Sequence, residues 1–127
     1  MTLLHDMVSY SKTFRDVLVW QKAHAFVREV YRLTEAFRKS ETYGLSSQFR
    51  RTAVSIAVSF AEGFKKRGKA DKLRFYNVSQ GSIEECKYDL ILAADLKFAD
   101  TSILQEWIDE VARLLEGYAS AMEACRS

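Results

Sequence analysis

The residues best placed to do chemistry lie in one short basic segment in the middle of the chain. Lys65, Lys66, Arg67, Lys69 and Lys72 fall within eight positions of one another. Cations at this density favour contact with phosphate groups, because each contact releases counterions from a nucleic acid. We define these five residues as the basic segment, and they are the first candidates for a nucleic-acid-binding site.

The basic segment also nearly matches a nucleotide-binding P-loop. Gly63, Gly68 and Lys69 have the required spacing, but Ala70 replaces the hydroxyl residue that would hold magnesium. A P-loop follows a β-strand, whereas the residues before Gly63 have a helical pattern. Nucleotide hydrolysis is therefore disfavoured, and we expect no cofactor.

A second pair of cations, Arg50 and Arg51, lies about 14 positions before Lys65. At ~1.5 Å per helical residue this separation is roughly 21 Å, so the pair does not belong to the basic segment. The same distance along the following helix brings Glu85 and Asp89 to the level of the pair. We favour an arginine–carboxylate network there, with phosphate binding as the alternative.

Other residue types that serve catalysis lack the partners that their chemistry needs. His24 has no glutamate three residues before it and no second histidine on its helix, which disfavours the metal motifs of helical proteins. Ser46 and Ser47 lack the glycine-flanked turn of a hydrolase nucleophile. Cys86 and Cys125 have no activating neighbour and no metal-binding spacing, so we expect reduced thiols. The sequence predicts no catalytic residue, no metal site and no enzyme activity.

The distribution of charge separates the chain into two parts. Residues 44–75 contain eight basic and two acidic residues, whereas residues 76–127 contain four basic and ten acidic residues. This asymmetry favours an anionic partner at one end of the molecule, with simple solvation or internal neutralisation as the alternative.

Composition and length indicate one domain. The 127 residues include 48% apolar residues and no low-complexity segment, which is sufficient for a single core. No stretch approaches the ~20 apolar residues that cross a bilayer. The first ten residues lack the pattern of a secretory signal, so we expect a cytoplasmic protein.

Apolar periodicity predicts four helices, since the chain contains no proline to interrupt them. We expect these helices over residues 14–37, 45–62, 71–96 and from 102 onward. Gly63, in a left-handed conformation, should end the second helix, and Asp71 should cap the third. Ser102 and Gln105 should form a capping box at the fourth. Gly81, with serines beside it in the third helix, indicates tight contact with a neighbouring helix.

Short loops between helices of similar length predict an antiparallel, up-down-up-down four-helix bundle, which is an all-α fold. Residues 1–13 would form an N-terminal extension and residues 14–127 the bundle. In this topology the basic segment lies at the same end as both chain termini.

The periodicity also predicts which side chains are buried in the bundle or between subunits. They are Trp20, Phe26, Phe49, Ile56, Phe60, Ile83, Leu90, Trp107, Val111 and Leu114. Further apolar residues beside the main stripes would make a large exposed patch on a monomer, so we expect self-association. These are Val19, Phe26 and Leu33 in the first helix and Phe75, Tyr88, Ile91 and Leu92 in the third.

Four stretches of the chain together resemble a known family. They are residues 19–24 (VWQKAH), 43–56 (YGLSSQFRRTAVSI), 61–64 (AEGF) and 81–85 (GSIEE). In combination they resemble the bacterial four-helix-bundle family of ribosomal-RNA intervening-sequence proteins, over nearly the whole chain after Phe14. This family is similar to the accessory variability protein of diversity-generating retroelements.

The resemblance implies a ring-like homopentamer that associates with nucleic acid and has no established catalytic reaction. Family members commonly have proline where Arg38 and Ala57 stand, and asparagine where Ser59 stands. Ala57 should leave the second helix straighter than in relatives. Arg50 and Arg51, in contrast, match the family pattern.

These observations favour a non-enzymatic nucleic-acid-binding or ribonucleoprotein accessory protein. Its basic segment would contact phosphates of RNA or DNA, with Arg50 and Arg51 as further candidates. The alternative is an oligomeric scaffold that binds another protein, such as a reverse transcriptase or a ribosomal component, without contacting nucleic acid. The sequence distinguishes neither RNA from DNA nor the identity of a protein partner.

Overall fold

The structure, a computed structural model, describes residues 12–39 and 44–125. In this part of the chain it contains four α-helices and no strand, which confirms the all-α prediction. The elements are the 3-10 turn η1 (Phe14–Asp16) and the helices α2 (Leu18–Glu35), α3 (Leu45–Lys65), α4 (Lys69–Asp95) and α5 (Ser102–Ala124). Of the predicted N-terminal extension, only Lys12 and Thr13 are described.

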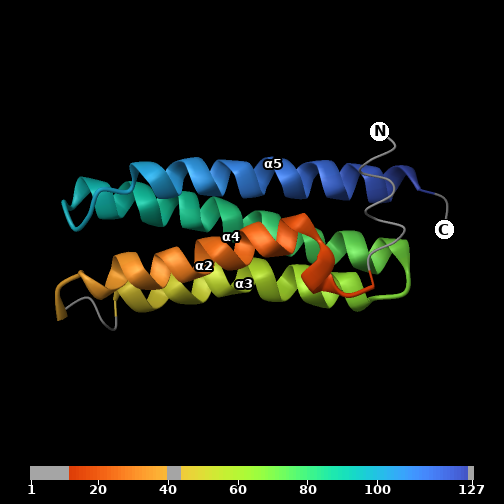
Figure 1. The fold of residues 1–127 in the computed structure, drawn as a ribbon, viewed down its shortest axis with the longest axis horizontal. Helices are drawn as coiled ribbons and strands as arrows, with labels where there is room; N and C mark the ends of the chain where they lie inside the picture. The colour runs from red at the N-terminus through yellow and green to blue at the C-terminus, as the bar shows by residue number, and fades with distance from the viewer. Residues whose placement is uncertain (1–11, 40–43, 126–127) are drawn as a thin grey trace.

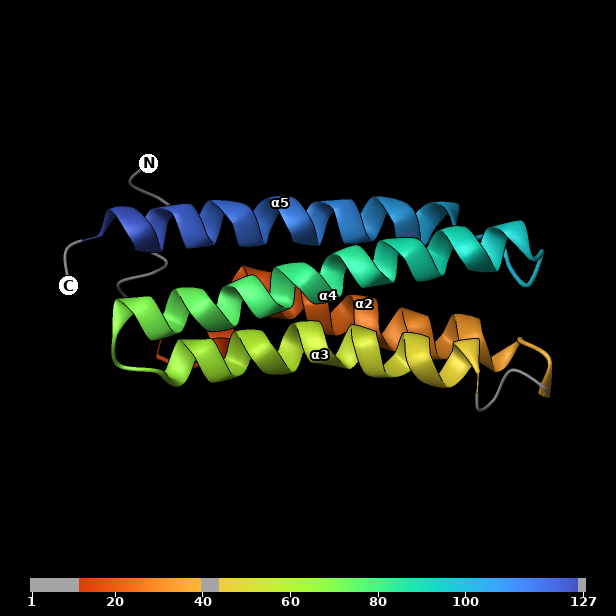
Figure 2. The ribbon, with the colours of Figure 1, turned by 180° about the vertical axis from the view of Figure 1, so that it is seen from behind.

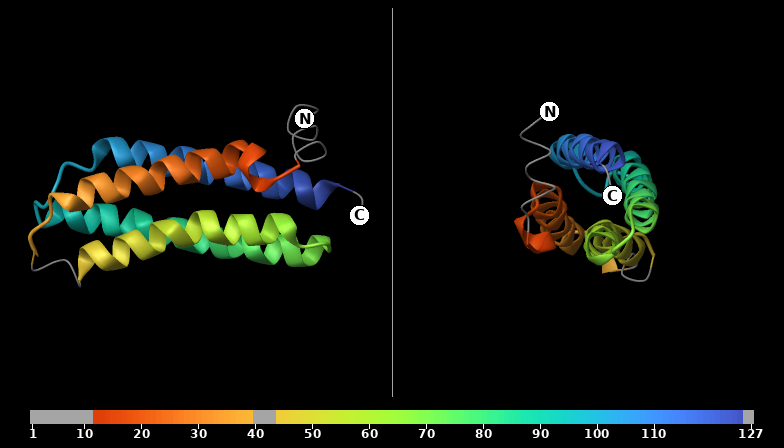
Figure 3. Two further views of the ribbon diagram at one scale, coloured as in Figure 1. Left: turned by 60° about the horizontal axis from the view of Figure 1, so that its bottom comes forward. Right: turned by 90° about the vertical axis from the view of Figure 1, so that its right-hand side faces the viewer.

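The four helices lie side by side along one long axis, and the chain reverses its direction at each connecting loop (Figure 1). The end view in Figure 3 places them in the order α2, α3, α4, α5 around a square, so that α2 also packs against α5. Figure 2 shows α3 and α4 beside each other for most of their length. The loop between α3 and α4 lies at the end where α2 begins and α5 finishes (Figure 1).

The first predicted helix is interrupted near its start. Thr13 accepts a hydrogen bond from the Arg15 amide, and the Asp16 carboxylate accepts one from the Thr13 amide. This reciprocal capping box closes η1 and leaves Val17 in an extended conformation before α2 begins. The Thr-x-x-Asp pattern at residues 13–16 is the sequence signature of this capping box. Because of the capping box, the helix begins at Leu18 and not at the predicted Phe14.

The predicted helix ends around the basic segment are wrong. Gly63 lies inside α3, which continues to Lys65, and no glycine among the described residues has a positive φ. A Cβ atom at Gly63 would lie 2.9 Å from the Phe75 Cβ and 2.8 Å from the Tyr76 ring, so the absence of a side chain lets α3 and α4 approach closely. Helix α4 begins at Lys69, and Asp71 lies in its first turn instead of capping it.

The start of α5 uses a different acceptor from the predicted one. Asp100 accepts hydrogen bonds from the Ser102 amide at 3.0 Å and from the Ser102 hydroxyl at 2.8 Å. Gln105 donates to the Thr101 hydroxyl at 2.8 Å, so Ser102 and Gln105 do not form the predicted capping box. The two hydrogen bonds hold the pKa of the Asp100 carboxyl below its usual value.

A continuous core fills the space between the four helices. Seven of the ten side chains predicted to be buried are buried within a single chain, namely Phe26, Phe49, Ile56, Phe60, Ile83, Leu90 and Val111. Trp20 and Leu114 are half-buried, and Trp107 is 37% exposed. In α5 the neighbouring line of Ile108 and Leu115 faces the core instead. Of the three α5 residues predicted to be buried, only Val111 belongs to the buried line, so the predicted side of α5 lay slightly to one side of the true one.

The two serines and the glycine in the middle of α4 lie on different sides of the helix. The Ser79 hydroxyl donates to the Ile56 carbonyl at 3.0 Å, and the Ser82 and Ser55 hydroxyls bond at 2.9 Å, so both serines make the predicted close contact with α3. Gly81 faces outward, and a Cβ atom placed there would meet nothing within 4 Å. Gly81 therefore has no packing role within the chain.

The apolar surface predicted to drive self-association is smaller than expected. Val19 and Phe26 of α2 are buried inside the chain and contribute nothing to an exposed patch. On α4, Tyr88 and Ile91 are both more than half exposed. Among the residues predicted to form the patch, those that are strongly exposed therefore lie on α4.

Candidate nucleic-acid interface

The basic segment lies at one end of the bundle, across the turn that joins α3 to α4. Lys65 is the last residue of α3, Lys66 and Arg67 are in the turn, and Gly68 precedes the first residue of α4. The side chains of Lys65, Lys66 and Arg67 are exposed. None of the three forms an ion pair with a residue in the described ranges. We call these three residues the terminal cations.

The two other members of the basic segment are used within the fold. The Lys69 Nζ donates to the backbone carbonyls of Glu123 at 3.0 Å and Cys125 at 2.8 Å, at the C-terminal end of α5. The Lys72 Nζ donates to the Phe64 carbonyl at 2.6 Å, at the C-terminal end of α3. Each ammonium group therefore donates to carbonyls at the C-terminal end of a helix and opposes the negative end of that helix dipole.

Burial and aromatic contacts distinguish these cations further. Desolvation lowers the pKa of Lys72, whose Nζ also lies 5.4 Å from the centre of the Phe64 ring. The Lys66 Nζ lies 4.8 Å from the centre of the Phe75 ring, a cation–π geometry that still leaves the residue exposed. The basic segment is thus divided into three exposed cations and two that stabilise helix ends.

The start of α4 adds a further source of positive potential at the terminal cations. Its N-cap, Gly68, provides no side-chain hydrogen bond to the amides of the first turn. The N-terminal end of a helix carries a partial positive charge, and its unpaired amides bind anions. Asp71 partly offsets this potential, although it is paired with Arg74 at 3.2 Å.

Three buried aromatic rings lie beneath the basic end and connect three helices. Phe60 of α3 stacks on Tyr76 of α4 with ring centres 5.0 Å apart, and the edge of Tyr118 of α5 meets Phe60 at 5.3 Å. Tyr76 and Tyr118 complete the triangle at 5.6 Å. This aromatic cluster fixes the ends of α3 and α4 relative to each other, and therefore also fixes the turn that carries the terminal cations.

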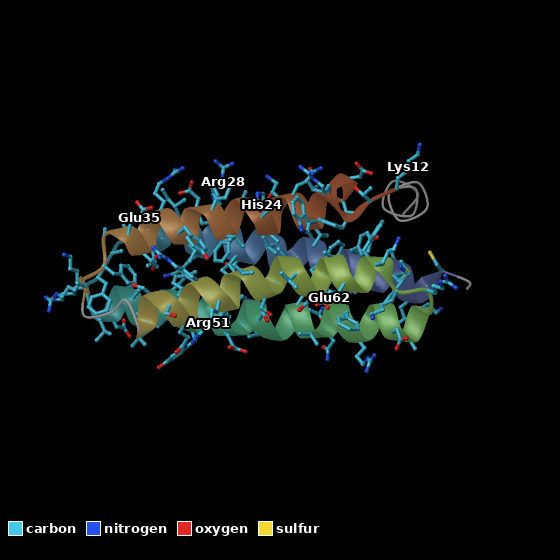
Figure 4. All side chains as sticks on the ribbon, turned by 90° about the horizontal axis from the view of Figure 1, so that it is seen from below. Lys12, His24, Arg28, Glu35, Arg51 and Glu62 are labelled. Atoms are coloured by element: carbon cyan, nitrogen blue, oxygen red, sulfur yellow. The ribbon has the colours of Figure 1, made fainter. Side chains whose placement is uncertain are left out.

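Sequence reasoning missed two cations at the same end. Lys12, labelled in Figure 4, and Arg15 of η1 are both exposed near the start of α2. The capping box at Thr13 turns the chain here, and η1 packs against α3. The Thr-x-x-Asp signal could have placed Lys12 and Arg15 beside a turn, but their proximity to the end of α3 depends on the tertiary fold.

The predicted network between Arg50 and carboxylates is wrong. The Arg50 Nε donates to the Thr34 hydroxyl at 2.7 Å, and its guanidinium lies 4.7 Å from the centre of the Tyr31 ring, so Arg50 packs on α2. Arg51 points away from the core (Figure 4) and forms no ion pair within the described ranges. Neither arginine therefore reaches Glu85 or Asp89.

Asp89 has a different partner from the predicted one. Its side chain is fully buried, and its Oδ1 accepts a hydrogen bond from the Gln48 Nε2 at 3.0 Å. Its Oδ2 has no hydrogen-bond partner among the described residues. Burial raises the pKa of the Asp89 carboxyl to about 6, against a partly opposing effect of the Gln48 hydrogen bond.

Replacing Asp89 with asparagine is expected to stabilise the protein above pH 6. Because the folded carboxyl has the higher pKa, it binds a proton between about pH 4 and 6 that the unfolded chain does not bind. The contribution of this carboxyl to the free energy of unfolding is therefore most favourable below about pH 4 and is lost as the pH rises to about 6. The free energy of unfolding at pH 7.5 should rise by about 1–3 kcal/mol in Asp89→Asn, with a flatter profile from pH 4 to 7. Urea unfolding across this range tests it, and equal or lower stability of the variant at pH 7.5 would contradict it.

The rest of the described chain offers little chemistry. Cys86 is buried, and desolvation raises the pKa of its thiol well above the usual range, which makes it a poor nucleophile. No group of three metal-ligating side chains comes together within residues 12–39 and 44–125. Within the same ranges, no helix combines the length and apolar character needed to cross a membrane.

Comparison with known proteins gives one family. The model of the family described as 23S rRNA-intervening sequence protein matches residues 15–118. This range begins in η1, ends at Tyr118 in α5 and contains every residue of the basic segment. A comparison with curated proteins gives no match.

Proposed function

Because the chain belongs to the 23S rRNA-intervening sequence protein family, we propose that it is a non-enzymatic accessory protein that binds RNA or DNA phosphates. The antiparallel bundle assembles as a ring-like homopentamer in the cytoplasm, and its basic end contacts the nucleic acid. The observation that carries the proposal is the cluster of exposed terminal cations, Lys65, Lys66 and Arg67, at one end of the bundle.

The location of the charges supports a phosphate-binding role over a purely stabilising one. Lys69 and Lys72 already occupy the carbonyls at the ends of α5 and α3, so those helix ends do not require the terminal cations. The open amides at the start of α4 add positive potential beside the same turn. Lys12 and Arg15 extend it on the neighbouring element.

The character of the site indicates contact with the backbone of a nucleic acid instead of reading of its bases. Lysine and arginine at the tip of a turn can follow phosphates, whereas base recognition requires side chains that enter a groove or stack on bases. The nearby rings of Phe60, Tyr76 and Tyr118 are buried in the core and are not available for stacking. Ring symmetry would repeat the terminal cations in every subunit around one face of the assembly.

The proposal is tested by titrating the wild-type protein into fluorescein-labelled single-stranded RNA and duplex DNA of arbitrary sequence. Fluorescence anisotropy should show binding at 50 mM salt that weakens steeply, by about 0.9 units of log affinity per unit of log salt for each phosphate contacted on duplex DNA. Absence of binding at low salt to both probes would overturn the proposal and favour the protein-scaffold alternative.

A further inference from the structure

An apolar groove runs between α2 and α3 on the outside of the bundle. It has a volume of about 350 Å³, and small side chains at its base leave it open. In Figure 4, His24 and Arg28 mark α2 and Arg51 and Glu62 mark α3, the two helices that border the groove. The lining includes Trp20, His24 and Val27 of α2 and Val54, Ala57 and Val58 of α3.

Helix α4 presents exposed apolar side chains, which we call the apolar ridge, and the described residues of the chain cover them only in part. Val78, Tyr88 and Ile91 are exposed by 49%, 59% and 51%, respectively. Tyr88 and Ile91, three positions apart, are neighbours on one outer side of α4, and Gly81, two turns before Tyr88, lies on the same side, whereas Val78 faces a different direction. A ridge of this kind on one bundle has the shape that a groove between two helices of another bundle accepts.

Gly81 lies on the exposed side of α4, between Val78 and Tyr88 in the sequence. It lies in the middle of the continuous helix α4, where glycine is unfavourable, and it makes no close contact with the described residues that would require the absence of a side chain. A notch next to exposed apolar side chains permits the close approach of a second helix. Among the described residues, the fold of the single chain therefore gives no reason for a glycine at this position.

The two sides of the bundle also carry opposite charge. Helices α2 and α3 together contain six basic and three acidic residues, whereas α4 and α5 contain five basic and ten acidic residues. Arg28 and Arg51, which mark the groove side, form no ion pair in the part of the chain that the structure describes, and neither does Glu85 near Tyr88 on the ridge side. The groove side of one molecule is therefore electrostatically complementary to the ridge side of another.

From these observations we infer that the groove between α2 and α3 receives the α4 ridge of a second copy of this chain. The contact is head to tail, because the two surfaces differ and each molecule presents one of each. Repetition of such a contact closes into a ring when the rotation between copies permits it. This inference rests on the assembly in the proposed function and adds the two surfaces that form it.

The test uses two variants that each remove one surface. Val58→Glu places a charge in the groove, and the double variant Tyr88→Glu with Ile91→Glu places charges on the ridge. All three side chains are exposed, so the fold should persist, as checked by circular dichroism. Ile103→Glu, at an exposed position on α5 outside both surfaces, is the matched control.

Sedimentation velocity without nucleic acid should give an assembly for the wild type and for Ile103→Glu. Each surface variant alone should sediment as a single chain of 14.6 kDa. An equimolar mixture of the two should form a two-chain species, because each mixed pair retains one intact groove and one intact ridge. Surface variants that assemble like the wild type, or a mixture that stays single-chain, would overturn the inference while leaving the assembly in place. A single-chain wild type would overturn both, whereas nucleic-acid binding is measured separately.

Gly81→Ala provides a second measurement that does not introduce a charge. In chains diluted until they are monomeric, it should raise the midpoint of thermal unfolding, because alanine favours an exposed helix. In the assembling range it should weaken association severalfold by filling the notch. Unchanged association of Gly81→Ala would contradict a close approach at this point of the ridge.

Discussion

Replacing Phe60 with alanine is expected to lower the free energy of unfolding by about 3–5 kcal/mol. Phe60 is fully buried and meets the rings of Tyr76 and Tyr118 at 5.0 and 5.3 Å, so its removal leaves a cavity between three helices. The two tyrosines cannot close this space without leaving their own contact. Chemical denaturation followed by circular dichroism measures the change.

Two neighbouring leucines of α5 provide a matched control for the position of the core. Leu115 is fully buried, whereas Leu114 is half-buried. Leu115→Ala should therefore cost about 2–5 kcal/mol, and Leu114→Ala should cost distinctly less. A loss below about 1 kcal/mol in Phe60→Ala, or a larger loss at Leu114 than at Leu115, would contradict the packing described above.

The number of helices and their approximate extent could be predicted from the sequence, because long apolar stripes with few breaks specify helices strongly. In α3 the prediction was correct: Phe49, Ile56 and Phe60 are all buried. In α5 the apolar surface is wide enough for two stripes. Which of Trp107 and Ile108 faces the core depends on where α2 and α4 lie, and periodicity within one helix does not contain that information.

The structural roles of Gly63 and Gly81 could not be predicted from their local sequence alone. Gly63 has the sequence context of a helix end, yet it lies within α3, where the Phe75 and Tyr76 side chains of α4 leave no room for a Cβ atom. Gly81 was expected to make a tight contact with a neighbouring helix, and no described residue of its own chain makes that contact. Both outcomes depend on the orientation of α4, which the sequence pattern alone did not specify.

The candidate site could be located from the sequence but not resolved into its parts. Lys69 and Lys72 have the same residue type and local density as Lys65, yet their ammonium groups meet backbone carbonyls of other helices. The carbonyl that Lys69 contacts at Cys125 is 56 positions away along the chain. Likewise, Arg50 contacts Thr34 of α2 and not the carboxylates of α4, because α3 turns this side chain towards α2.

Reversing the three terminal cations is expected to remove most of the affinity for nucleic acid. In the variant Lys65→Glu, Lys66→Glu, Arg67→Glu, three attractive contacts become repulsive while the contacts of Lys69 and Lys72 remain. The slope of log affinity against log salt on duplex DNA should fall by about 2–3 units, since each lost phosphate contact accounts for about 0.9. Anisotropy titrations over a salt series measure this change, with helicity and assembly confirmed beforehand.

A matched variant at the opposite end separates local contact from overall charge. Arg38, Lys39 and Lys97 are exposed and follow the ends of α2 and α4, away from the basic end. Their joint replacement by glutamate changes the net charge by the same amount. It should leave most of the salt slope intact, because distant charges are screened over ~10 Å at 0.1 M salt. Equal losses in the two triple variants would show that net charge, and not the basic end, causes binding.

The most direct measurement of where nucleic acid binds is acetylation of lysines in the wild-type protein, followed by mass spectrometry with and without RNA. Lys65 and Lys66 are exposed in the free protein, as are Lys39 and Lys97 at the far end, so all four should react in the absence of RNA. The proposed function predicts that RNA protects Lys65 and Lys66 severalfold and leaves Lys39 and Lys97 unchanged. Protection of the far lysines alone, or no protection of Lys65 and Lys66 under conditions where RNA is bound, would contradict it.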